Sequence, residues 1–124
     1  MRKKVLIVEN DEDIRNIVGY ILENEGYEVA GCNYTLENLP TMTADLILLD
    51  EWVNQKEGPM LCKEIKALEK FAQVPVVIFS TSMDIAGIAA NCKANGYVQK
   101  PFDLDMLISE VRKFLPLDKV YSKV

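Results

Sequence analysis

The sequence lacks the features that mark several large protein classes. Its 124 residues contain no apolar run approaching the roughly 20 residues that a membrane-spanning helix requires. After the basic start, the few apolar residues before Glu9 are too short a run for the core of a signal peptide. There are no internal repeats, linkers or low-complexity segments. We therefore expect one cytoplasmic domain spanning residues 1–124, with a core at about 3–116 and a short C-terminal tail at 117–124.

Cysteine is too sparse for a disulfide framework or a metal-binding pair. Cys32, Cys62 and Cys92 form no CxxC motif, and any disulfide would leave one of them unpaired. Their neighbours are apolar or lie in helical patterns, which is typical of buried or half-buried free thiols in a reducing compartment.

Basic residues are outnumbered by acidic ones, 14 to 19. The net charge is −5, with acidic residues crowded near the N-terminus. A nucleic-acid-binding surface needs a basic face to neutralise phosphates, so direct binding of nucleic acid is not expected.

Short apolar runs alternate with helical patterns along the whole chain. Continuous apolar runs predict strands buried on both faces at 5–8, 46–49 and 76–79, and weaker runs predict strands at 27–32 and 97–99. Apolar residues at helical spacing predict helices at 13–25, 59–72, 84–95 and 103–115. Gly26 and Gly96 are expected to end the first and third of these, and Pro40 limits any helix at 36–43 to a turn or two.

This alternation predicts where chemistry would take place. Five strands alternating with helices favour a parallel sheet covered on both faces, and ligands of such sheets bind at the carboxyl ends of the strands. The polar residues at those strand ends are Glu9, Asn10, Asp11, Asp50, Ser80 and Lys100. Converging carboxylates repel unless a cation intervenes, and their hard oxygen ligands suit Mg²⁺. A carboxylate beside a hydroxyl and a lysine can attack phosphorus, with the hydroxyl and the ammonium holding the transferred oxygens.

Each of these residues also has a purely structural explanation. Asp50 is consistent with a simple strand end, and Lys100 with a solvated charge. The acidic run at 9–13 suits the start of a helix, and Ser80 suits a helix cap. Their shared position at successive strand ends favours a functional site.

The sequence resembles response-regulator receiver domains from Lys3 to about Leu115. The resemblance is carried by VLIVENDEDI at 5–14, DLILLD at 45–50, Gly58, VPVVIFS at 74–80 and GYVQKPF at 96–102. The Lys-Pro-Phe triplet after a short strand is quite specific at that distance from the other motifs. The resemblance implies an α/β fold: a five-stranded, doubly wound parallel sheet in a flavodoxin-like (βα)5 three-layer sandwich.

The resemblance also implies a function in two-component signalling. Asp50 would accept a phosphoryl group from a sensor histidine kinase or a phosphotransfer protein, with Mg²⁺ required. The protein would be no enzyme beyond catalysing its own phosphorylation and dephosphorylation. The implied metal ligands are Glu9, Asn10, Asp50 and the backbone carbonyl of Trp52.

Two further roles follow from the resemblance alone. Ser80 and Lys100 would contact the phosphoryl oxygens, and Ser80 and Tyr97 would form a switch. The output would pass to a partner protein through the face made by the helix at 84–95, the strand at 97–99 and the last helix.

The sequence departs from the family pattern at several places: Asn54 stands where proline is common, Pro40 interrupts a short second helix, and the stretch from Ser80 to Lys100 is about two residues shorter than typical. Two further departures lie at the expected site. Asn10 stands where a second acidic residue is usual, so Mg²⁺ binding is expected to be weaker but not abolished. Trp52 is unusually bulky for its position. These departures leave open a pseudo-receiver that acts as an interaction module without phosphorylation.

Two enzyme classes fit less well. A haloacid-dehalogenase-type phosphatase needs a second aspartate two residues after the first, where this chain has Trp52. A flavin-binding flavodoxin needs a hydroxyl- and glycine-rich loop after the first strand, and the acidic run at 9–13 would repel a phosphate there.

Overall fold

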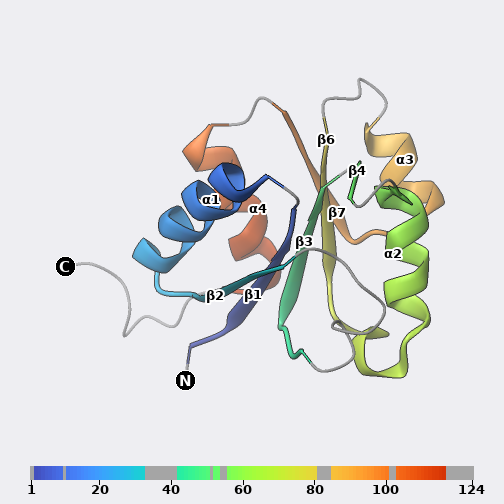
Figure 1. Cartoon of the computed structure of the whole chain (residues 1–124), viewed down its shortest axis with the longest axis horizontal. Coiled ribbons are helices and arrows are strands. Elements are labelled where there is room, and N and C mark those ends of the chain that lie inside the picture. The colour runs from blue at the N-terminus through green and yellow to red at the C-terminus, as the bar shows by residue number, and fades with distance from the viewer. Residues whose placement is uncertain are drawn as a thin grey trace.

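The protein is a parallel sheet between two layers of helices (Figure 1). The computed structural model describes residues 2–9, 11–32, 42–50, 52–53, 56–80, 85–100 and 103–116. The five parallel strands are β1 (Lys4–Val8), β2 (Glu28–Cys32), β3 (Leu46–Asp50), β6 (Val76–Ser80) and β7 (Gly96–Gln99). Their order in the sheet is β2-β1-β3-β6-β7, the order of flavodoxin-like doubly wound sheets, which confirms the predicted fold class.

Among the residues that the structure describes, two helices cover each face of the sheet. Helices α1 (Glu12–Asn24) and α4 (Leu104–Phe114) lie on one face, and α2 (Gly58–Ala67) and α3 (Ile85–Asn91) lie on the other (Figure 1). The segment between β2 and β3 that contains Pro40 lies outside the described residues. None of the helices that the structure describes is long and apolar enough to cross a membrane.

The central strands bury side chains on both faces. Leu6 and Val8 of β1 pack in the cluster under α2 and α3, while Val5 and Ile7 pack in the cluster under α1 and α4. Successive side chains of a strand point to opposite faces, so a strand covered on both faces needs an unbroken apolar run. This is why the runs at 5–8, 46–49 and 76–79 were readable from the sequence.

The helix predicted at 59–72 is wrong in its second half. Helix α2 ends at Ala67, Leu68 is extended (φ −76°, ψ 126°), and a 3₁₀ turn, η2, follows at Glu69–Phe71. The apolar spacing continues across the break because Phe71, at the end of the turn, is buried in the same core cluster. Spacing alone therefore does not reveal the interruption.

Helix α3 ends earlier than predicted, and Gly96 does not end it. Lys93 adopts a left-handed backbone conformation (φ 63°) directly after the helix. The amide of Lys93 donates to the carbonyl of Ala90 (3.3 Å), and that of Ala94 donates to Ala89 (2.9 Å). This is the Schellman pattern that closes many helices, with lysine where glycine is usual.

Gly96 serves the packing of the last helix instead. It opens β7, and a Cβ atom added there would lie 2.3 Å from Oε2 of Glu110 and 3.0 Å from the ring of Phe114. A larger residue would force the side chains of Glu110 and Phe114 to shift, so glycine favours the close approach of α4 to β7.

Two other local expectations have opposite outcomes. Gly26 has a positive φ (103°) just after α1, as expected of a residue that ends a helix. Ile17, one of the apolar residues whose helical spacing predicts that helix, is 60% exposed, and the buried positions are Val18, Gly19 and Leu22.

Two of the three cysteines are buried free thiols, as predicted. Cys62 and Cys92 both lie in the core cluster under α2 and α3. Burial, with a smaller contribution from neighbouring Cys92, raises the pKa of the Cys62 thiol to about 12. The side chain of Cys32 lies outside the described part of the chain.

Tyr27 ties β2 to the end of the last helix. Its buried hydroxyl donates a hydrogen bond to the backbone carbonyl of Leu115 (2.6 Å). Tyr27→Phe should lower the free energy of unfolding by about 1–3 kcal/mol, because the carbonyl is left buried without its donor. Urea unfolding measures the change, and Tyr20→Phe is the matched control because Tyr20 is 68% exposed. Equal unfolding free energies for the Tyr27 variant and the wild type would contradict this role.

Candidate functional site

The carboxyl ends of the central strands bring four of the predicted residues to one edge of the sheet. Asp50 is the last residue of β3 and Ser80 the last of β6, while Glu9 and Lys100 directly follow β1 and β7. Because these strands are neighbours in register, their ends lie side by side. Glu9, Asp50 and Ser80 are also the buried polar residues among those that the structure describes (3%, 8% and 1% exposed).

Lys100 is held against Asp50. Its Nζ lies 2.8 Å from Oδ1 of Asp50, in an ion pair whose side chains are 18% and 11% exposed. Its backbone amide donates to the carbonyl of Ser80 (2.7 Å), and its ammonium lies 4.7 Å from the centroid of the Phe79 ring. The chain after β7 and the ring of Phe79 thus fix the position of the ammonium beside the carboxylate.

Glu9 lies in an environment that disfavours its negative charge. Its pKa is raised to about 8, chiefly by burial and then by a hydrogen bond to Asp50 and repulsion from that carboxylate, against a smaller lowering by Lys100. Its Oε2 is buried and has no hydrogen-bond partner within the part of the chain that the structure describes. A buried carboxylate oxygen without a donor is costly, so a further positive group beside Glu9 would be stabilising.

The two carboxylates fit a magnesium ion by their chemistry. Mg²⁺ binds oxygen ligands, commonly one or two carboxylates with water completing the shell. The described residues contain no cluster of three or more His, Cys, Asp or Glu side chains that would hold a metal without help. Glu9 and Asp50 are therefore the two buried carboxylates that the described structure offers to such an ion, and Oε2 of Glu9 has no partner among the described residues.

The remaining predicted site residues differ in how far the structure describes them. Asn10 lies outside the described residues. Trp52 is described in its backbone only, as part of a short hairpin of β4 (Trp52–Val53) with β5 (Lys56–Glu57), where a polar loop was expected. Tyr97 lies on β7 and is 44% exposed.

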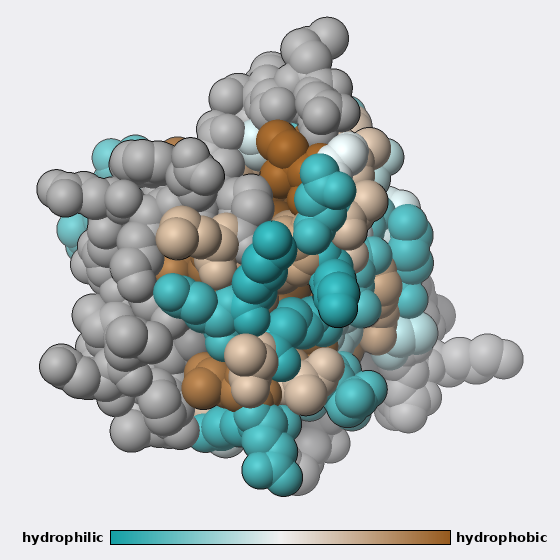
Figure 2. All heavy atoms as spheres, turned by 90° about the vertical axis from the view of Figure 1, so that its right-hand side faces the viewer, coloured by the Kyte–Doolittle hydropathy of each residue, from teal (hydrophilic) through white to brown (hydrophobic). Residues whose placement is uncertain are grey.

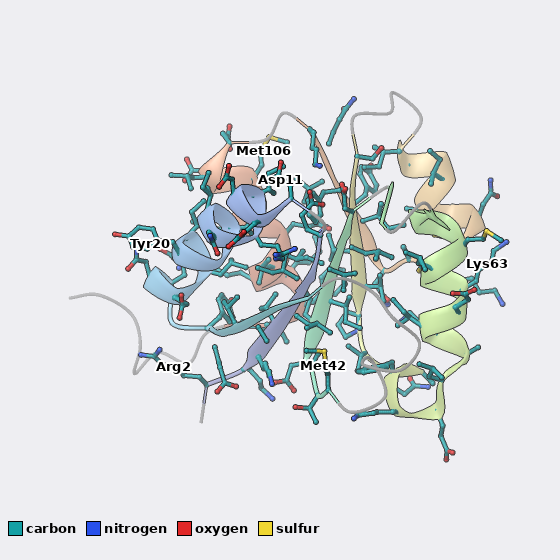
Figure 3. All side chains as sticks on the ribbon, in the orientation of Figure 1. Arg2, Asp11, Tyr20, Met42, Lys63 and Met106 are labelled. Carbon is teal, nitrogen blue, oxygen red and sulfur yellow. The ribbon has the colours of Figure 1, made fainter. Side chains whose placement is uncertain are left out.

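Asp11 caps helix α1 with its side chain, while its backbone amide donates a hydrogen bond to the Glu9 carboxyl group. Oδ1 of Asp11 accepts hydrogen bonds from the amides of Asp13 (2.9 Å) and Ile14 (3.2 Å), which caps α1. Figure 3 shows Asp11 at the same edge of the sheet, at the start of the helix. The acidic run at 9–13 therefore serves both purposes weighed from the sequence: Glu9 enters the site and Asp11 caps the helix.

Sequence reasoning missed two residues that support the site. The guanidinium of Arg15 donates to the backbone carbonyl of Glu9, which fixes the chain where it leaves β1. Phe79 places its ring under the Lys100 ammonium. Arg15 packs closely against Gly31, where an added Cβ atom would lie 3.1 Å from Cδ of Arg15. The glycine is visible in the sequence, but its contact with Arg15 is known only from the fold.

The family follows from comparison with known proteins. Residues 5–112 match the family described as "Response regulator receiver domain", which covers most of the chain. The chain belongs to the response-regulator receiver family. This match confirms the predicted family. Receiver domains are the signal-receiving modules of two-component systems.

Individual relatives agree. This receiver domain is 28% identical over 120 residues to "Sporulation initiation phosphotransferase F" of Bacillus subtilis, with 94% of this chain and 97% of that protein covered. It is 32% identical over 126 residues to "Transcriptional regulatory protein CrdR" of Helicobacter pylori, with 97% of this chain and 58% of that protein covered. The chain therefore spans nearly all of one relative and little more than half of the other.

Solved structures confirm the fold. A putative response regulator of Chloroflexus aurantiacus superimposes with a TM-score of 0.85 at 21% identity, covering 94% of this chain and all of that one. The chemotaxis protein CheY4 of Vibrio cholerae superimposes with a TM-score of 0.82 at 23% identity, covering 92% and 99%. At these identities the likeness shows the fold alone.

Proposed function

We propose that this receiver domain is a phosphoacceptor switch and that Asp50 is the residue that accepts the phosphoryl group. The observation that carries the proposal is the Asp50–Lys100 ion pair (2.8 Å). It lies at the same edge of the sheet as the buried residues Ser80 and Glu9. A carboxylate held beside an ammonium and a hydroxyl is positioned both to attack phosphorus and to have its product stabilised. Membership in the receiver family supports the same conclusion.

The proposed reaction is transfer from a phosphohistidine of a histidine kinase or a phosphotransfer protein. A carboxylate oxygen of Asp50 forms a bond to phosphorus, the N–P bond to the imidazole breaks, and the imidazole leaves with a proton from solvent. The ammonium of Lys100 and the hydroxyl of Ser80 contact the phosphoryl oxygens. We propose no reaction beyond this transfer and the later hydrolysis of the acyl phosphate.

We assign the Mg²⁺ ligands to Glu9, Asn10, Asp50 and the backbone carbonyl of Trp52. The bound ion would neutralise the crowded carboxylates and the charge of the incoming phosphoryl group. The unpartnered Oε2 of Glu9 and the raised pKa of that carboxyl support a cation at this position.

Restoring a negative charge at position 10 should tighten Mg²⁺ binding. Asn10→Asp should lower the dissociation constant about ten- to a hundredfold, because a unit charge near the ion adds a few kcal/mol that solvent partly offsets. Fluorescence of Trp52, the one tryptophan of the chain, reports the titration. The matched control is Asn16→Asp, which adds the same charge at an exposed position on α1. Equal affinities for the Asn10 variant and the wild type would contradict the ligand assignment.

We propose that the output passes to a partner protein through the face built by α3, β7 and α4. In this mechanism Ser80 moves toward the phosphoryl group and Tyr97 shifts inward, so that one of two arrangements becomes favoured. Support comes from the placement of these residues on adjacent strands, with Ser80 buried and Tyr97 half exposed. We propose that residues 1–124 act as one domain.

Covalent labelling tests the proposal against the pseudo-receiver alternative. The protein is incubated with phosphoramidate, with and without Mg²⁺, and its intact mass is measured. We expect the mass of one phosphoryl group to be added with Mg²⁺ and none to be added with excess chelator. No gain under either condition, from protein that is folded by circular dichroism, would favour a phosphorylation-independent interaction module.

A further inference from the structure

A basic cavity lies on the opposite side of the sheet from α1 and α4. It has a volume of about 670 Å³ and is formed by α2, the turn after η2 and the end of α3. Three lysines line it: Lys63, Lys66 and Lys93. Figure 2 shows this side of the molecule, where hydrophilic residues gather, and Figure 3 places Lys63 on the outer side of α2. Three lysines therefore line one cavity of a chain whose net charge is −5.

The three ammonium groups are available to a ligand. None of them forms an ion pair with a residue that the structure describes, whereas Lys100 and Lys113 do. Lys63 and Lys66 are three residues apart on α2, a spacing that places both on the same side of the helix. Lys66 donates one hydrogen bond to the carbonyl of Val74 (2.7 Å), which holds its ammonium at the cavity and leaves two further donors.

Lys93 occupies a position where lysine is unfavourable for the backbone. It has the left-handed conformation (φ 63°) that closes α3, and glycine is the usual residue there because it has no Cβ atom. A cation near a helix C-terminus is favoured by the helix dipole, but Lys and Arg confer that benefit equally well from the preceding turn. The strained conformation therefore indicates that the ammonium of Lys93 is useful where it is, at the cavity.

The size and walls of the cavity fit a small molecule. A volume of about 670 Å³ is within the usual range of small-molecule sites. Ala67 and Ala72 supply apolar wall, and Asn91 adds an amide. Burial also lowers the pKa of Lys66, and partial removal from water strengthens its attraction for an anion.

We propose that this cavity binds a small organic polyanion, a molecule that carries two or more phosphate or carboxylate groups on a short carbon skeleton. The three lysines pair with its anionic groups, and the alanine wall contacts its carbon atoms. The site is separate from the edge that holds Asp50, and its binding does not depend on phosphorylation of that residue.

The test is a binding titration of the unphosphorylated full chain without Mg²⁺. Citrate, adenosine diphosphate and pyrophosphate are added at constant ionic strength, and amide chemical shifts are followed by NMR. We expect saturable shifts concentrated at Ala67, Asn91 and Lys93 with at least one of the two organic probes, and weaker binding of pyrophosphate. Shifts spread over all exposed lysines without saturation would overturn the proposal.

Two variants separate binding from folding. Lys93→Gly should lower the affinity for the probe about fivefold or more, as expected for losing one unit charge near the surface. The same variant should have a higher temperature of unfolding, because the strained conformation is relieved. Lys63→Gln, at an exposed position, should weaken binding to a similar extent with little change in stability. Lys3→Gln is the control, since Lys3 is exposed before β1, and should bind the probe as the wild type does.

Two outcomes would contradict the proposal even if some binding is seen. An unchanged affinity of both Lys63→Gln and Lys93→Gly would show that the cavity is not the binding site. Saturable binding of an oligoglutamate peptide at these amides, with none of either organic probe, would identify the cavity as a docking site for an acidic protein segment instead.

Discussion

The Asp50→Asn variant should gain no phosphoryl group under conditions in which the wild type is labelled. Asparagine keeps the shape of the side chain, but its amide is not a nucleophile toward phosphorus. Asp50 is 8% exposed and forms its ion pair with Lys100 through one carboxylate oxygen, so the substitution removes the reacting group without opening the strand end. Intact-mass measurement after incubation with phosphoramidate and Mg²⁺ detects the loss.

Asp45→Asn is the matched control for this loss. Asp45 lies just before the other end of β3, and its Oδ2 accepts a hydrogen bond from the amide of Lys4 (2.8 Å). Its variant should be labelled like the wild type. A phosphoryl mass on the Asp50 variant equal to that of the control would show that another residue is the acceptor.

Removing the ammonium of Lys100 should have the second largest effect. Lys100→Met should slow phosphorylation by about a hundred- to a thousandfold, the usual loss when one preorganised donor to a developing charge is removed. The ammonium lies 2.8 Å from Asp50 and is the cation that faces both carboxylates of the site in the described structure. The measurement is the initial rate of labelling at saturating Mg²⁺.

The same variant has a second readout that depends on charge. Without Lys100, Glu9 and Asp50 face each other without a compensating cation, so the variant should be less stable than the wild type in Mg²⁺-free buffer. Added Mg²⁺ should restore more stability to the variant than to the wild type. Lys113→Met is the control, because Lys113 pairs with Glu110 on exposed α4 and should affect neither the rate nor the response to Mg²⁺. A labelling rate close to that of the wild type would contradict the role of Lys100.

The layout of the sheet and the residues at its edge were predictable from the sequence for a physical reason. A strand buried on both faces must be apolar throughout, so its end is marked by the first polar residue. Asp50 and Ser80 are such residues at the ends of β3 and β6, Lys100 directly follows the edge strand β7, and parallel strands place their carboxyl ends at one edge. The position of a residue along the chain therefore carried most of the information about the site.

Features that depend on contacts between distant segments were not predictable in the same way. The break after Ala67 is hidden because Phe71 continues the apolar spacing from a 3₁₀ turn. Lys93 closes α3 in a conformation that favours glycine, so the glycine three residues later was the more reasonable choice. The basic cavity joins residues about 30 positions apart, and only the packing of α3 beside α2 brings them together.

The site itself shows the same division. Glu9 was expected from its place after β1, but its buried, unpartnered oxygen and its raised pKa follow from the neighbours that the fold supplies. The support that Arg15 gives to the Glu9 backbone, and that Phe79 gives to the Lys100 ammonium, also depends on side chains meeting in three dimensions. Sequence position identified the reacting groups, whereas the groups that orient them required the structure.

Locating the modified residue in the wild-type protein tests the central claim most directly. After labelling with phosphoramidate and Mg²⁺, borohydride reduction converts an aspartyl phosphate to homoserine, and peptide mass spectrometry identifies the altered position. We expect homoserine at position 50 and at no other aspartate. Reduction at Asp11 or Asp13 with residue 50 unchanged, or no reduced residue in protein that carries a phosphoryl mass, would contradict this expectation.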